Sequence, residues 1–88
     1  MKPTLADAAN TVIPAYLALL QRGLSVRREP VSSGGTEVWW IAEDAARRFV
    51  AEDPLALLGL VALYETRGLE WQASDEQIDR FIAEFDTA

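Results

Sequence analysis

The sequence predicts a small α+β fold: an N-terminal helix, a three-stranded antiparallel sheet, and two C-terminal helices packed on one sheet face. Three observations predict it. Helical apolar spacing marks the first quarter of the chain, β-branched and aromatic residues dominate residues 36–43, and two capped helical segments follow residue 52. Because 88 residues is a typical size for one small domain, we treat residues 1–88 as a single domain.

The first helix is expected within residues 1–23. An apolar stripe follows Pro14, and Gly23 supplies the left-handed position that ends many helices. Proline inside a helix removes a hydrogen bond, so Pro14 leaves two possibilities. Either the helix is kinked at Pro14, or it begins near Asn10 or Thr11 and holds Pro14 in its first turn.

Residues 24–52 are expected to form a β-meander. Residues 24–29 alternate at first and are ended by Pro30, and residues 36–43 form the second strand. Residues 44–53 fit either a short helix or a third strand. We favour the strand, because a two-stranded hairpin is barely stable alone and three strands give a face worth packing against.

Two helices complete the expected fold. Asp53 is a helix N-cap followed by proline, which starts an apolar helix over residues 53–68. Ser74 and Gln77 form a capping box before an acidic amphipathic helix over residues 74–86. The apolar residues of this last helix recur with helical spacing and share one face: Ile78, Phe81, Ile82 and Phe85.

The helix over residues 53–68 is apolar around its whole circumference. Such a helix has to be covered on all sides. It is either the central helix, enclosed by the sheet and the other helices, or one of its sides is covered by a second copy of the chain. Gly59 in its middle costs helix stability, so we expect it to mark a close approach of another backbone.

The second strand carries two adjacent tryptophans, which must point to opposite faces of the sheet. The longer apolar run includes Trp40, so that face is assigned to the core and Trp39 and Ile41 to the outer face. If Arg27 shares this outer face, the three residues form a compact patch of the kind enriched at binding hot spots. Trp39, Ile41 and Arg27 are therefore candidate protein-binding residues, unless a loop or the N-terminal segment covers Trp39.

Charge is concentrated at the C-terminal end. The net charge of the chain is −6, and residues 70–88 hold one Arg and six acidic residues. This balance argues against nucleic acid as a direct ligand, because phosphates are held mainly by Lys and Arg. The simplest role of the acids is to keep a small domain soluble, and the alternative is an acidic face that meets a basic partner. The candidate acidic face consists of Glu70, Asp75, Glu76, Asp79 and Glu84.

Catalytic and metal chemistry have little support. The chain contains no His and no Cys, so the commonest general base, thiolate nucleophiles and zinc-finger ligands are missing. We expect no catalytic residue, no metal site and no cofactor. No signal peptide and no membrane-length apolar run is visible, so a cytoplasmic protein that contacts no membrane is expected.

These observations favour a small acidic, non-catalytic protein-binding or regulatory domain that associates with itself or with another protein. One alternative is an immunity-type or inhibitor-type protein that blocks a nucleic-acid-acting enzyme by presenting carboxylates in place of phosphates. A small enzyme that uses carboxylates is the least favoured alternative, because a domain of this size hardly encloses a cleft.

Overall fold

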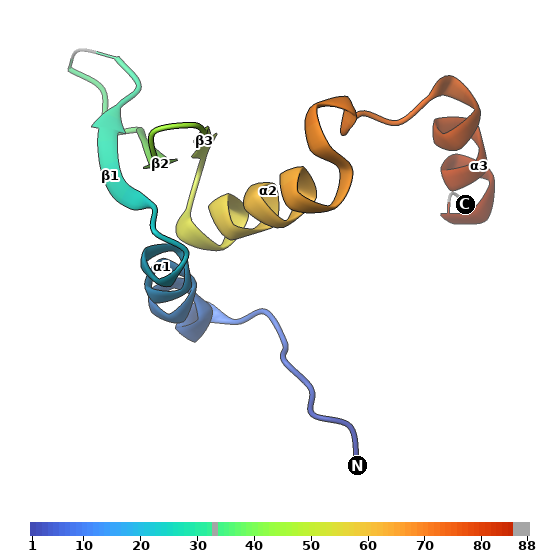
Figure 1. The fold of residues 1–88 in the computed structure, drawn as a ribbon, viewed down its shortest axis with the longest axis horizontal. Helices are drawn as coiled ribbons and strands as arrows, with labels where there is room; N and C mark the ends of the chain where they lie inside the picture. Colours follow the sequence, from blue (N-terminus) through green and yellow to red (C-terminus); the bar gives the residue numbers. More distant parts are fainter. Residues whose placement is uncertain (33, 86–88) are drawn as a thin grey trace.

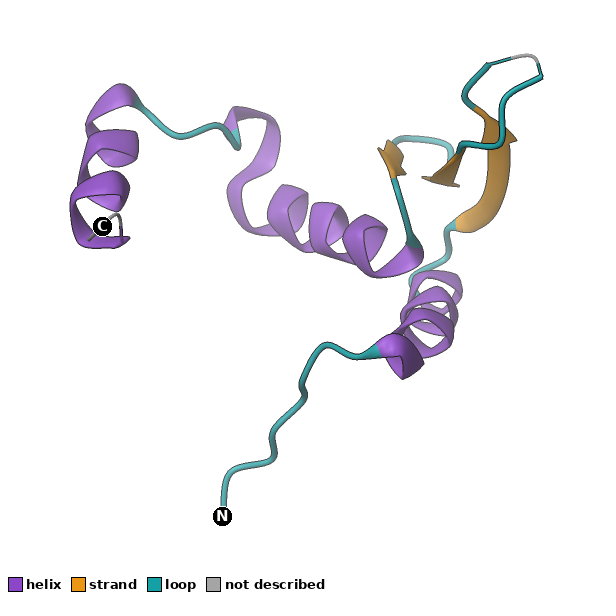
Figure 2. Ribbon diagram, turned by 180° about the vertical axis from the view of Figure 1, so that it is seen from behind, coloured by secondary structure: helices purple, strands orange, loops and turns teal. Residues whose placement is uncertain are grey.

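The computed structural model describes residues 1–32 and 34–85 and confirms the expected α+β order of elements (Figure 1). Figure 2 shows the same arrangement from behind, with the strands to one side of the middle helix. In chain order the elements are η1 (Ala9–Thr11), α1 (Val12–Gln21), β1 (Ser25–Pro30), β2 (Val38–Glu43), β3 (Arg48–Ala51), α2 (Pro54–Arg67), η2 (Gly68–Glu70) and α3 (Asp75–Phe85).

The first helix begins later than residue 1. α1 starts at Val12, so Pro14 lies in its first turn, where its missing N–H costs no helical hydrogen bond. Residues 1–8 have no regular structure and run away from the rest of the fold as exposed chain (Figure 1). At the other end, Gly23 adopts a φ of 84°, the left-handed conformation expected after the helix.

The sheet is an antiparallel meander with strand order β1-β2-β3. Residues 48–51 form the third strand, which decides between the two alternatives for this region. Asp44 shapes the turn before it, because one carboxylate oxygen accepts hydrogen bonds from the backbone N–H groups of Ala46 and Arg47, both at 2.8 Å.

One face of the sheet packs against α1 and α2. The register places Val26, Ala42 and Phe49 in one row across the three strands, so they share this inner face. The ring of Phe49 meets the ring of Tyr64 edge-on, with centroids 5.9 Å apart. The buried cluster between the helices and the sheet contains Leu19, Leu24, Ala42, Phe49, Ala51, Leu57 and Val61.

α2 is covered on one side only. Asp53 caps its start by accepting a hydrogen bond from the N–H of Ala56 at 2.7 Å, as the Asp-Pro pair predicts. Leu57 and Val61 are fully buried in the core. On the opposite side Gly59 is exposed, and a Cβ added there would meet no atom within 4 Å. The close approach expected at Gly59 is therefore not made by any part of the chain that the structure describes.

α3 stands apart from the sheet (Figures 1 and 2). Its capping box is present: the N–H of Gln77 donates to Ser74 Oγ at 3.2 Å, and the N–H of Ser74 donates to Gln77 Oε1 at 2.9 Å. The expected packing of this helix on the sheet face is not found, since every residue of α3 is exposed. The link over residues 71–74 carries the helix past the end of α2. Asp86, which the predicted helix included, lies outside the described residues.

Candidate functional site

The three residues expected to form a binding patch lie together on the outer face of the sheet, opposite to the core. The register places Arg27 and Val50 on either side of Ile41. Trp39 precedes Ile41 by two residues on the same strand and therefore shares its face. Trp40 faces inward and packs against the buried core, so the structure agrees with the predicted faces of the two tryptophans.

Exposure within this patch differs from the expectation at Ile41. Its side chain is only 2% exposed, because it lies on the central strand between Arg27 and Val50 on the two flanking strands. Trp39 is 38% exposed and Val50 is 43% exposed. The apolar surface that a partner can reach on this face therefore consists of Trp39 and Val50, with Ile41 beneath them.

The charge of Arg27 is already paired within the sheet. Its Nε donates to Glu29 and its Nη1 donates to Glu43, each at 2.9 Å. These hydrogen bonds, that to Glu29 first, raise the pKa of Arg27 above its usual value. Arg27 is thus held in a fixed position over the outer face, and its contribution to binding is its aliphatic stem more than a free charge.

The predicted acidic residues are all exposed: Glu70, Asp75, Glu76, Asp79 and Glu84. They do not form one continuous face. Asp75 and Asp79 are one turn apart and border one edge of the apolar side of α3, whereas Glu84 borders the other edge. Glu76 lies on the far side, where it pairs with Arg80 at 3.3 Å. An apolar strip therefore separates the acids that a phosphate-mimicking surface would have to bring together.

We call this strip the α3 apolar face. Ile78 is 45% exposed, Ile82 is 49% exposed, and Phe81 and Phe85 are each 64% exposed. The two phenylalanine rings contact each other with centroids 5.0 Å apart, so they present one joint surface. Nothing else in the described part of the chain covers them.

A second apolar surface lies at the opposite end of the fold, in a groove of about 390 Å³ between α1 and the sheet. We call it the α1–β1 groove. Ile13, which is 70% exposed, lies on its helix side, and Val26 and Trp40 lie on its sheet side. The residues that line it are Val12, Ile13, Tyr16, Val26, Arg27, Arg28, Trp40 and Pro54.

Arg28 gives this groove a positive edge. It lies directly across from Trp40 in the sheet register, and its guanidinium carbon is 5.3 Å from the centre of the Trp40 ring. Arg28 takes part in none of the ion pairs between residues that the structure describes. The groove therefore combines an apolar floor with a guanidinium whose charge no described carboxylate neutralises.

A third apolar surface, the Trp71 groove, lies between β3 and the end of α2. It measures about 300 Å³ and includes Tyr64, Leu69 and Trp71, with Arg48 at its rim. Trp71 is 47% exposed and Leu69 is 84% exposed. The Trp71 ring therefore lines an open groove and is only partly covered.

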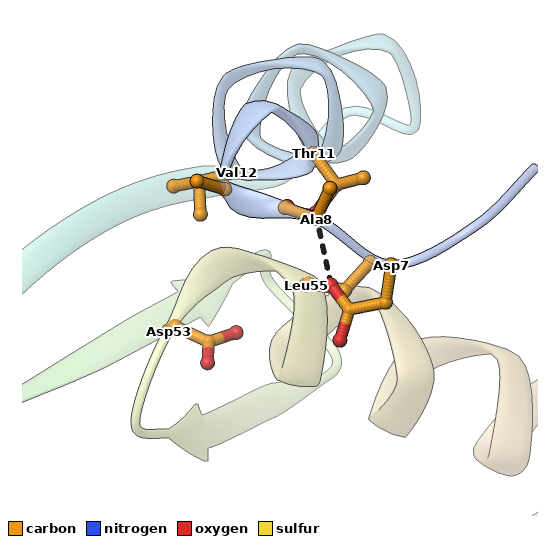
Figure 3. A pocket seen from close by; sticks show the side chains of 7 residues that line it. Asp7, Ala8, Thr11, Val12, Asp53 and Leu55 are labelled. Atoms are coloured by element: carbon orange, nitrogen blue, oxygen red, sulfur yellow. Dashed lines mark hydrogen bonds between the residues drawn. The ribbon is translucent and has the colours of Figure 1, made fainter.

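Figure 3 shows a shallow hollow where η1 meets the start of α2, with two carboxylates at its rim. Asp53 is engaged as the N-cap of α2 through the N–H of Ala56. Asp7 accepts a hydrogen bond from the hydroxyl of Thr11 at 3.3 Å, drawn as a dashed line in Figure 3. Both carboxylates therefore serve local turns, and the lining residues include no second group that would activate the Thr11 hydroxyl as a nucleophile.

Among residues 1–32 and 34–85, no three acidic side chains gather closely enough to hold a metal ion. Nor is any helix of that part of the chain long and apolar enough to cross a membrane.

Sequence reasoning did not find the α1–β1 groove. The groove depends on the register that sets Arg28 opposite Trp40 and on the side of α1 that faces the core. The sequence carried one signal for this groove: α1 has more apolar residues than are needed to cover the side of the helix that faces the core. Ala15 and Leu19 fill the buried side, and Ile13 and Leu17 remain 70% and 50% exposed.

Searches found no family model that matches this chain and no solved structure that matches it significantly.

Proposed function

We propose that this chain is a small, non-catalytic protein-binding domain of the cytoplasm, and that α3 is its recognition element. The observation that carries the proposal is the exposure of the α3 apolar face, with Phe81 and Phe85 each 64% exposed. Contiguous apolar patches of this kind on small proteins mark sites of interaction with another protein. An amphipathic helix that lays its apolar side into a groove is a common mode of such recognition.

The length of α3 supports the same conclusion. It has 11 residues, and its only support inside the described chain is the capping box and one exposed ion pair. Isolated helices shorter than about 12–15 residues are marginal in water, and most helical stability in proteins comes from packing an apolar face. A binding surface outside the protomer would supply that packing.

The acids at the edges of α3 fit a recognition role as well. Asp75 and Asp79 border the apolar face, and neither takes part in an ion pair between the described residues. A partner with Arg or Lys beside an apolar groove would therefore be preferred over one with acids there. The apolar residues would supply affinity and the acids would select the partner and its orientation.

The proposal is tested by binding experiments with variants on the two sides of α3. The full-length chain is used as bait for proteins of a cell extract and, separately, for a labelled copy of itself. Phe81→Ser removes a large apolar side chain from the α3 apolar face, and Ala83→Ser is the matched control on the opposite side. We expect complexes with the wild type and with Ala83→Ser that Phe81→Ser loses. Complexes that survive Phe81→Ser, or none with any chain, would contradict the proposal.

A further inference from the structure

We propose that α3 of one protomer docks into the α1–β1 groove of a second copy of this chain, and that the exchange is reciprocal in a two-fold dimer. This inference rests on the proposed function, because it takes α3 as the recognition element and names its partner. In this dimer the α3 apolar face is covered by the surface that Ile13, Val26 and Trp40 form in the other copy.

The first argument is complementary shape and polarity. The α3 apolar face is a convex strip that ends in two phenylalanine rings. The α1–β1 groove is a concave apolar surface at the other end of the protomer, between a helix and a strand. Both remain open within one chain, with Ile13 at 70% and Phe85 at 64% exposed. A convex apolar helix face can pack into a concave apolar groove, and each surface would then be covered by the other.

The second argument is charge complementarity. The α3 apolar face is bordered on one edge by Asp75 and Asp79, and the groove is bordered by Arg28. None of the three is in an ion pair between described residues. The same asymmetry holds for whole segments, since residues 1–35 carry a net charge of +2 and residues 71–88 a net charge of −4. Two copies related by a two-fold axis, with α3 of each against the groove of the other, bring opposite charges together twice.

The third argument is area. The four residues of the α3 apolar face are 45–64% exposed. With about 180 Å² of surface for each side chain, the face exposes about 400 Å². Reciprocal docking covers two such faces, about 800 Å², and each groove has to contribute a similar area to reach about 1,600 Å², the size of a standard stable interface. A single docked helix would bury only half of that, so the area favours the symmetric exchange.

The test of position uses engineered cysteines, since the natural chain contains none. One chain carries Ile82→Cys in α3 and the other carries Ile13→Cys in the groove. The two are mixed, oxidised and separated without reducing agent. We expect a disulfide-linked heterodimer. As a matched control, a chain with Leu69→Cys presents a cysteine in the Trp71 groove, and we expect at least about 10-fold less heterodimer with Ile82→Cys, because effective concentration falls steeply when two sites cannot meet.

The test of charge uses a reversal and its rescue, with sedimentation of the full chain as the readout. Arg28→Glu alone, and Asp75→Lys with Asp79→Lys, are each expected to weaken the dimer by about 10-fold or more, because like charges then face each other. All three changes in one chain restore opposite charges and should recover most of the loss. Glu70→Lys makes the same kind of charge change before α3 and should leave the dimer within about threefold of the wild type.

The outcomes separate this inference from the proposed function. A monomer at all concentrations whose α3 still captures another protein would overturn the homodimer and leave α3 as a recognition helix. A monomer in which α3 is protected would show that the helix docks within its own chain, and would also overturn the inference. A dimer linked through Leu69→Cys in place of Ile13→Cys would place α3 in the Trp71 groove and would also overturn the inference. If the wild-type chain forms no complex that depends on α3, both the homodimer inference and the proposed function are contradicted.

Discussion

Replacing each of the two adjacent tryptophans by alanine should have very different effects on stability. Trp40 packs against the buried core and carries Arg28 over its ring at 5.3 Å. Trp39 lies on the outer face and is 38% exposed. Because neighbouring strand residues face opposite ways, one substitution opens a cavity in the core and the other trims the surface.

The magnitudes follow from the burial. A tryptophan packed against the core and partly buried, like Trp40, covers roughly 150–200 Å², which at about 25 cal/mol per Å² corresponds to about 4–5 kcal/mol. We therefore expect Trp40→Ala to lower the free energy of unfolding by about 3–5 kcal/mol, within the range seen for buried aromatic residues. Trp39 is 38% exposed and still covers part of the sheet, but its removal opens no cavity in the core, so Trp39→Ala should cost a smaller amount, about 1–2 kcal/mol. Since domains are stable by about 5–15 kcal/mol in total, Trp40→Ala should leave little folded protein on warming.

The assay is urea unfolding followed by circular dichroism. Trp40 also lines the α1–β1 groove, so both substitutions are made in chains that carry Phe81→Ser and are compared at one low protein concentration. This removes any contribution of self-association to the midpoint. Equal losses for Trp39→Ala and Trp40→Ala, or a larger loss for Trp39→Ala, would refute the assignment of the two sheet faces.

Three further substitutions test local features of the protomer by urea unfolding. Asp53→Ala removes the acceptor for the Ala56 N–H and should cost about 1 kcal/mol; an unchanged midpoint would show that the cap does not stabilise α2. Gly59→Ala adds a Cβ in open space within a helix and should raise the stability of the monomeric protomer by about 0.5–1 kcal/mol; a loss would mean that something contacts Gly59. The backbone N–H of Ala46 and the side chain of Arg47 lower the pKa of Asp44 below its usual 3.8 in the folded chain. A lowered folded pKa gives stability that is present above pH 3.8 and is lost as the pH falls through the folded value. The wild type should therefore lose more stability on acidification through this range than Asp44→Asn, and parallel losses would contradict this pKa direction.

Local sequence signals predicted the elements well, because each depends on residues close together in the chain. The Asp53 cap and the Ser74–Gln77 capping box both form the hydrogen bonds that their residue types imply. Strand alternation was enough to separate Trp39 from Trp40. The third strand followed from the need of a hairpin for a further partner.

The expectations that failed depend on contacts between distant parts of the chain. Ile41 was expected to be exposed, and its burial between Arg27 and Val50 requires the register of all three strands. Amphipathic spacing showed that the apolar face of α3 needs a cover, but periodicity carries no information on what that cover is.

The late start of α1 was one of the two possibilities that the sequence left open, because Pro14 is compatible both with a kink and with a first turn.

The most direct test of α3 as the binding element is amide hydrogen exchange of residues 75–85 in the full chain, measured from low to high protein concentration. We expect exchange to be fast in dilute protein, where an 11-residue helix has no packing, and to slow by about 10-fold or more as copies associate. The same residues in Phe81→Ser should exchange fast throughout. Fast exchange of α3 in the wild type at every concentration, or slow exchange that Phe81→Ser leaves unchanged, would contradict the account.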